Sequence, residues 1–325
     1  MVRRAASGQN VSATKDTDMR SASDPMPMHR QDWLLLVVLS VLWGGSFFFN
    51  GVALRDLPPL TVALARVGLG AACLLIVIRP LGGRLPARAA DWLPFAIMGL
   101  LNNVIPFTLF LMAQTVISSG LASVLNATTP LFAVLVMAAA GEERLTGRRI
   151  AGVLIGIGGV ALLRAPGLSA SDQMLGIALC LGAALSYGFA GYWGRRALKG
   201  VPPITSATGQ LICSTPVMAI AAALIDRPWT LPVPGAATWA ALAGLGTLCT
   251  ALAYILFFRI LNRSGAVNVV LVTLLIPVTT ILLGVSLLNE PLAVNEIAGA
   301  LVIAASLLVI DGRVLGWLRR RAFPA

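Results

Sequence analysis

The chain has 325 residues, of which 58% are hydrophobic and only 11% are charged, and its formal net charge is +11. Soluble domains carry roughly 25% charged residues, so this composition excludes an ordinary soluble protein. The apolar residues form runs of about 20, the length that a helix needs to cross a hydrocarbon core of about 30 Å. The sequence therefore predicts an all-α membrane protein that crosses the bilayer several times.

Polar tails flank the apolar part of the chain. Residues 1–32 are polar and mixed in charge, and we expect a disordered cytoplasmic tail there, with a second, basic cytoplasmic tail over 315–325. Between the tails, ten transmembrane helices are predicted at 33–53, 59–79, 91–113, 118–140, 148–164, 174–194, 203–224, 236–258, 266–288 and 294–313. The cysteines all lie inside these spans without CxxC spacing, which favours packing over a disulfide or metal role.

An internal duplication organises these spans. Residues 129–163 align with residues 276–310 without a gap, at an offset of 147 residues, and further matches occur upstream at an offset of 145. The matched pairs are Pro130 with Pro277, Glu143 with Glu290, Gly152 with Gly299, Gly99 with Gly244 and Gly120 with Gly265. The sequence predicts two five-helix repeats, 33–164 and 174–314.

The basic residues predict the orientation. With the N-terminus in the cytoplasm, 20 of the 24 Lys and Arg residues lie in the tails and loops on that side. Arg55, Arg164 and Arg227 lie on the other side, and Arg66 lies within a span. This asymmetry follows the positive-inside rule, so we expect both termini in the cytoplasm and no nucleic-acid partner. Because each repeat has five spans, the second repeat is inverted, an arrangement typical of secondary transporters with a site near the midplane.

Several segments together carry a family resemblance. They are Trp43-Gly44-Gly45 in the first span, LLNNVIPFTLFLMAQTVISSGLASVLNATTPLF over 100–132, GEERLTGRRIAG over 141–152 and NEPLAVNEIAG over 289–299. From Trp33 to Val314 the chain resembles the drug/metabolite transporter superfamily and is most similar to its EamA-type exporters. The second acidic turn departs from the pattern, with Asn-Glu in place of Gly-Glu. The resemblance implies export of small metabolites, amino acids or drug-like solutes across an inner membrane, and it specifies no substrate.

Acidic residues and histidine are absent from the centres of the predicted spans. All 13 acidic residues lie in the tails, in loops or at span ends, and the only histidine, His29, lies in the N-terminal tail. Proton relays, hydrolytic sites and catalytic metal sites in a membrane depend on such side chains. We therefore expect no enzymatic activity, no catalytic residue, no metal and no cofactor.

The candidate substrate site consists of polar and aromatic residues near the midplane. These are Trp43, Ser46, Asn102, Asn103, Asn126, Thr129, Tyr187, Thr250 and Thr273. An unpaired amide in hydrocarbon costs several kcal/mol, so the adjacent Asn102 and Asn103 need partners, either on neighbouring helices or in a solute. Adjacent helical residues point about 100° apart, so one amide can pack while the other faces a cavity. For Trp43, packing and solute contact both stay open.

Arg66 is the one charge well inside a span. An intramembrane charge is costly and indicates function by default, and here it predicts contact with an anionic solute. The alternative is a structural arginine that extends toward the membrane surface or binds the carbonyls of a neighbouring helix.

Gly152 and Gly156 form a GxxxG motif, which predicts a close helix contact and a homodimer face.

The leading hypothesis is a secondary transporter in the lipid bilayer, an exporter of small solutes. A channel for small neutral solutes and a non-transporting scaffold are the alternatives. Inverted repeats favour the transporter over the scaffold, whereas a neutral polar cavity suits a channel as well.

Overall fold

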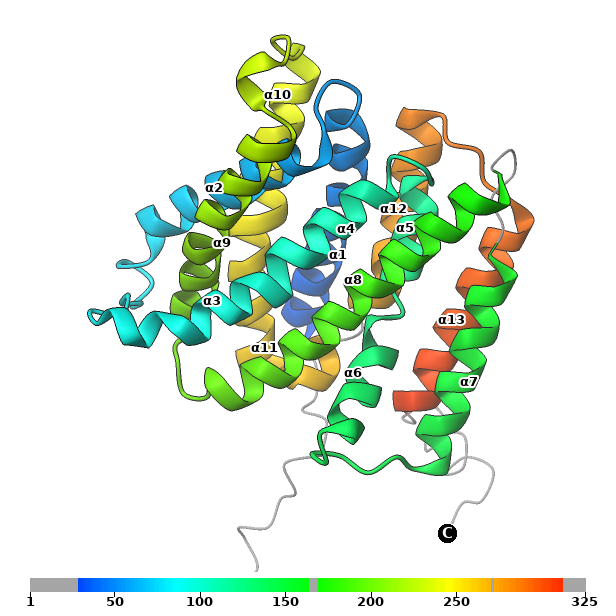
Figure 1. The fold of residues 1–325 in the computed structure, drawn as a ribbon. Coiled ribbons are helices and arrows are strands. Elements are labelled where there is room, and N and C mark those ends of the chain that lie inside the picture. The colour runs from blue at the N-terminus through cyan, green and yellow to red at the C-terminus, as the bar shows by residue number, and fades with distance from the viewer. Residues whose placement is uncertain (1–28, 164–168, 270–271, 312–325) are drawn as a thin grey trace, which may run out of the picture.

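The computed structural model describes residues 29–163, 169–269 and 272–311, and every regular element within these ranges is helical. The α-helices are α1 (Arg30–Ala53), α2 (Pro59–Val77), α3 (Leu93–Gly99), α4 (Ile105–Ala113), α5 (Ser119–Asn126), α6 (Thr129–Ala139), α7 (Gly147–Leu162), α8 (Ala170–Ala197), α9 (Pro203–Ile225), α10 (Ala236–Ala243), α11 (Ala253–Val269), α12 (Val272–Leu288) and α13 (Val294–Asp311). Two short π-helical segments, Leu100–Val104 and Gly244–Leu252, join α3 to α4 and α10 to α11. Figure 1 shows the resulting helical bundle.

The multi-pass, all-helical prediction is confirmed. Eight helical stretches in the described ranges have at least 18 residues and enough apolar character to cross a membrane. Two predicted spans are shorter, with 17 residues in α12 and 16 in α7. The fourth span is interrupted between α5 and α6, where Pro130 occupies the first turn of α6 and cannot donate a backbone hydrogen bond.

Two predicted boundaries differ from the structure. The segment 259–265 was expected to be a loop, but α11 continues through it to Val269. No Pro or Gly interrupts this polar stretch before its last residue, and the Arg263 guanidinium lies 3.0 Å from the Asp32 carboxylate of α1. The other difference is that α1 begins at Arg30, inside the predicted tail, while residues 1–28 and 315–325 lie outside the described ranges.

The helix ends form two faces. On one, the basic face, Arg195 binds Glu143 at 3.0 Å and the Arg84 N–H donates to Thr205 at 3.2 Å. On the other, the opposite face, Asp56 accepts hydrogen bonds from the Thr238 hydroxyl at 2.6 Å and the Gly235 N–H at 3.0 Å. In Figure 1 the α6–α7 connection of the basic face lies at the bottom and the α9–α10 connection of the opposite face at the top.

The Asp56 contact is maintained at neutral pH. The hydrogen bonds from Thr238 and Gly235 hold the pKa of the Asp56 carboxyl below its usual value. A lowered folded-state pKa stabilises the fold above the unfolded-state pKa, and this contribution is lost as the pH falls through the lowered value.

The two π-helical segments lie at corresponding positions of the two repeats, directly after Gly99 in the first and at Gly244 in the second. In the first repeat, Pro106 removes a backbone donor just beyond the segment. In the second, the Thr250 hydroxyl donates to the Leu245 carbonyl at 2.7 Å, five residues earlier. Such segments widen a helix locally and are frequent at functional sites.

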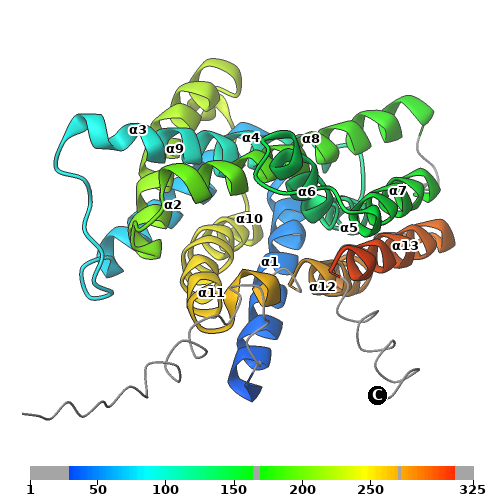
Figure 2. The same ribbon diagram turned by 90° about the horizontal axis from the view of Figure 1, so that it is seen from below.

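The α7 and α13 helices run side by side (Figures 1 and 2) and approach closely through glycines. A β-carbon at Gly159 would lie 3.0 Å from the Ile303 nitrogen and 3.1 Å from the Gly299 carbonyl oxygen. Gly152 and Gly156 lie against Ile310, Ser306 and the α6 residue Leu131. The GxxxG motif thus joins helices within one chain, so the dimer expectation loses its basis in this motif.

Adjacent glycines provide a matched test of this packing. We expect Gly159→Leu to destabilise the protein by about 1–3 kcal/mol, because the side chain would meet the α13 backbone. Gly158→Leu gains the same helix propensity, but its β-carbon meets nothing within 4 Å. Thermal unfolding of both purified variants in one detergent checks this, and equal midpoints would contradict the proposed packing.

Candidate functional site: a cavity between the two repeats

A cavity of about 540 Å³ lies between the two halves of the chain. Its walls come from α1, α2, α5, α6 and the span that contains α3 and α4 in the first half, and from α8, α9, α11, α12 and the second π-helical segment in the second half. The α7 and α13 helices contribute no residue to this lining.

Most predicted site residues meet in this cavity. Those that line it are Trp43, Ser46, Arg66, Asn102, Asn126, Thr129, Tyr187, Thr250 and Thr273. Asn103 does not: its side chain is fully buried beside the cavity. The two neighbouring amides therefore differ, with Asn102 facing the cavity and Asn103 packed among helices.

A hydrogen-bonded network holds these two amides. Asn102 donates to the Gln210 side-chain oxygen at 2.9 Å and to the Tyr254 hydroxyl at 3.0 Å. Asn103 donates to Ser214 at 3.2 Å and accepts from the Tyr254 hydroxyl at 2.8 Å. The network joins the first π-helical segment to α9 and α11, so it links the two repeats.

Gln210 and Tyr254 were not among the predicted site residues, although both line the cavity. Gln210 is the only amide in the predicted span 203–224, and Tyr254 is one of three tyrosines in the chain. A buried amide within an apolar span needs a partner, and this was the signal that could have identified Gln210.

Aromatic rings form much of the remaining wall. The Trp43 and Phe257 ring centroids lie 5.4 Å apart, and those of Phe110 and Tyr187 lie 6.2 Å apart. Tilted ring pairs at these separations give an apolar surface with polar groups at its edges. Apolar walls with a few polar groups and a volume of several hundred Å³ are typical of sites for small organic molecules.

Arg66 is only 7% exposed and points into the cavity rather than toward the membrane surface. Its Nε donates to the Thr250 hydroxyl of the second repeat at 3.1 Å, and its Cζ lies 3.8 Å from the centroid of the Phe107 ring. No carboxylate of the described residues forms an ion pair with it.

The cavity is closed at the end near the opposite face. The Glu290 carboxylate accepts hydrogen bonds from the backbone N–H groups of Ser119 at 3.0 Å and Gly120 at 3.3 Å, at the start of α5. Gln114 lies beneath this contact, where it accepts from the Asn50 side chain at 2.9 Å and donates to the Ser119 hydroxyl at 2.9 Å. A carboxylate at a helix N-terminus is favoured by the free N–H groups and the helix dipole.

At its other end the cavity extends to the basic face, where Arg195, Leu198 and Pro203 line it. The Arg195 side chain is 62% exposed, and it pairs there with Glu143. Glu143 also pairs with Arg149 at 2.9 Å.

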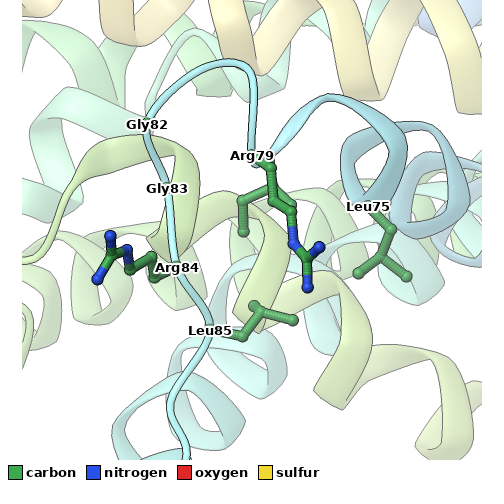
Figure 3. A pocket seen from close by; sticks show the side chains of 7 residues that line it. Leu75, Arg79, Gly82, Gly83, Arg84 and Leu85 are labelled. Atoms are coloured by element: carbon green, nitrogen blue, oxygen red, sulfur yellow. The ribbon is translucent and has the colours of Figure 1, made fainter.

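A second hollow of about 970 Å³ lies at the α2–α3 connection (Figure 3). Its walls come from the single segment 75–85, and the Arg79 and Arg84 side chains there point in different directions. This hollow lies outside the space between the repeats and contains none of the predicted site residues.

The two kinds of asparagine provide a stability test. We expect Asn103→Leu to lower the free energy of unfolding by about 1–3 kcal/mol, because it leaves the Tyr254 and Ser214 hydroxyls with fewer partners. Asn126→Leu is the control: the Asn126 side chain is half-buried at the cavity wall and has no hydrogen bond within the described part of the chain. Thermal unfolding of the two purified variants checks this, and equal stabilities would show that the network contributes little.

Comparison with known proteins agrees with this architecture. Residues 32–165 and 174–311 each match the EamA-like transporter family. An uncharacterized transporter of Bacillus subtilis, YvbV, is 27% identical over 284 residues, which cover 86% of this chain and 90% of the relative. The uncharacterized inner membrane transporter YedA of Escherichia coli is 27% identical over 285 residues, again 86% of this chain and 90% of the relative. A solved crystal structure with 20% identity shares the fold, with a TM-score of 0.63 over 89% of this chain and 98% of the other. This chain thus belongs to the EamA-like transporter family, and it is a multi-pass membrane protein.

Proposed function

We propose that this protein exports small organic solutes across the inner membrane as a secondary transporter that works by alternating access. The observation that carries the proposal is the cavity between the two repeats, which extends to the basic face and is closed by Glu290 at the opposite face. Inverted repeats around a central site favour this mechanism, because exchanging the conformations of the two halves opens the site to the other side.

The charge asymmetry supports export as the direction of transport. If the basic face is cytoplasmic, as the excess of Lys and Arg there favours, the cavity takes up solute from the cytoplasm. Closure at one end also favours a transporter over a channel, which needs both ends open at once. Counterflow, in which solute on one side accelerates uptake of labelled solute from the other, is expected of the transporter only.

The repeat suggests how the closed end changes. The Ser119–Gly120 pair that binds Glu290 corresponds to Ser264–Gly265 in the second repeat. The counterpart of Glu290 is the acidic pair Glu142–Glu143, of which Glu143 aligns with it directly. Glu142 shares its backbone setting instead: it follows Gly141, and Glu290 follows Asn289, and both preceding residues have the left-handed conformation. Asn tolerates this backbone conformation better than most residues other than Gly, which is consistent with the Asn-Glu departure.

In the state described here the basic face is arranged differently. Ser264 lies inside α11, so its N–H is part of a continuous helix, and Glu143 pairs with arginines instead. In the exchanged state, α11 would break before Ser264, and the freed N–H groups would bind the Glu142–Glu143 pair while Glu290 releases α5. The two acidic turns thereby act as alternating gates.

Loss of the Glu290 charge should therefore favour opening at the opposite face. We expect Glu290→Gln to raise the labelling rate of a cysteine at Ser46, deep in the cavity, by roughly 3- to 10-fold, because a hydrogen bond to a neutral group contributes about 1 kcal/mol less than one to a charged group. The measurement uses an impermeant thiol reagent applied to intact cells, in a background without the native cysteines.

The control for this experiment is Asp172→Asn. Asp172 lies near the start of α8 and, within the described part of the chain, bonds only Ser169 of its own helix end. Equal labelling rates in the Glu290→Gln variant and this control would contradict a gating role for Glu290.

The orientation is tested separately. We expect a cysteine introduced at Arg84 to be labelled only after the membrane is permeabilised, and one at Trp229 to be labelled in intact cells, because the first lies on the basic face and the second between α9 and α10. Trp229 is 71% exposed, so access does not limit the reaction. Labelling of position 84 from outside would refute a cytoplasmic basic face and, with it, export as the direction.

A further inference from the structure

We propose that the solute carried in this cavity is an organic anion with an aromatic or similarly flat apolar body, whose carboxylate binds Arg66. The inference rests on the proposed function only in taking the cavity as the transport site. It narrows the solute from small organic molecules in general to one charge type and one shape.

The charges of the cavity wall are all positive. Among the residues that the structure describes, its lining contains two arginines, Arg66 and Arg195, and no Asp, Glu or Lys. Arg195 is exposed at the mouth and already paired with Glu143, whereas Arg66 is buried and has no acidic partner among the described residues. A buried cation without a counter-ion is costly, and an anion bound beside it reduces that cost.

The geometry of Arg66 leaves one edge available for a ligand. Thr250 accepts from Nε, and the Phe107 ring lies 3.8 Å from Cζ against one face of the guanidinium. The two terminal nitrogens have no hydrogen-bond partner in the described part of the chain, and neither is a fully enclosed atom. Two parallel N–H groups of this kind match the two oxygens of a carboxylate.

Thr250 and Phe107 therefore act as positioning residues for this edge. Thr250 is itself fixed by its hydrogen bond to the Leu245 carbonyl at 2.7 Å, and it packs closely on Gly70 of α2, whose added β-carbon would lie 2.8 Å from the Thr250 methyl. The Arg66 charge is thus held at the contact between the repeats, where a bound anion would interact with both of them.

The body of the solute is selected by the rings beside Arg66. Phe110 and Tyr187 form a tilted pair with an interplanar angle of 31°, and Trp43 and Phe257 form another. A ring or a flat chain can pack against these rings while its carboxylate reaches Arg66. The volume of about 540 Å³ accommodates a molecule of this size.

An ammonium group has no comparable partner. It would find no carboxylate among the described lining residues and would meet the positive charge of Arg66, so amines and zwitterions with the same body are disfavoured. An anion-selective site of this kind differs from a general site for amphipathic molecules, which would bind anions, cations and zwitterions alike.

Three probes with one phenyl body test the charge preference: phenylacetate, L-phenylalanine and phenethylamine. Binding is measured at neutral pH by titration calorimetry with the purified full chain in lipid nanodiscs. We expect phenylacetate to bind at least roughly 10-fold more tightly than either other probe, the size expected for hydrogen bonds to a charged group.

Variants assign the preference to Arg66. We expect Arg66→Gln to weaken phenylacetate binding by roughly 10-fold or more and to leave phenethylamine binding unchanged or tighter. Arg66→Lys keeps the charge and supports folding but loses the bidentate hydrogen-bonding geometry, so it should bind phenylacetate with an intermediate affinity. Arg148→Gln, which removes one exposed charge of the basic face outside the cavity, should match the wild type.

Three results would overturn the proposal. The first is that phenylacetate shows no saturable binding, and the second is that phenethylamine or phenylalanine binds as tightly as phenylacetate. The third is that the Arg66→Gln and Arg66→Lys variants both bind phenylacetate with the affinity of the wild type. Counterflow in proteoliposomes separates this from the transport function. Arg66-dependent binding of phenylacetate without counterflow would keep the anion site and refute the transporter, whereas counterflow of the amine or zwitterion alone would keep the transporter and refute the anion site.

Discussion

Polar groups placed in a hydrocarbon core must find their partners inside the protein, and here the two repeats satisfy this requirement through each other. Arg66 of the first repeat binds Thr250 of the second, the Asn102–Asn103 pair binds Gln210 and Tyr254, and the Ser186 hydroxyl donates to the Leu101 carbonyl at 2.7 Å. These contacts surround the cavity. The site is therefore a region where the polar groups of the two halves meet.

In the proposed mechanism, the same requirement would give the ends of the cavity two alternative arrangements. An N–H group at a helix start needs an acceptor, and at α5 that acceptor is the Glu290 carboxylate of the other repeat. On the basic face the equivalent N–H groups are satisfied within α11, which frees Glu143 to pair with Arg149 and Arg195. In the proposed exchange, each set of N–H groups is bonded either within its own helix or to a carboxylate of the other repeat. The α7–α13 pair, joined by glycines and absent from the cavity wall, stands apart from this exchange.

The sequence predicted the features that depend on composition along the chain. Apolar runs predicted the helices, and the residues predicted near the midplane, such as Trp43 and Tyr187, do come together in the cavity, because helix rise places a residue at a definite depth. The sequence did not predict which residues and helices contact one another. Whether Asn102 or Asn103 faces the cavity depends on rotation about the helix axis, and the π-helical segment that contains both alters that rotation. The partner of the Gly152–Gly156 face, α13, and the continuation of α11 past Arg259 depend on tertiary contacts that no local pattern contains.

The central claim is that the two ends of the cavity open in alternation, and distances between spin labels on the two repeats test it most directly. One pair, at Thr115 and Leu292, spans the closed end near Glu290, and a second pair, at Ala140 and Arg259, spans the basic face; all four positions are exposed. Pulsed electron resonance on the purified protein in nanodiscs measures both distance distributions. The account predicts two populations at each end that change in opposite directions, so that solute or a change of pH or lipid that lengthens one distance shortens the other. A single unchanging distribution at both ends, or distances that lengthen together, would contradict it.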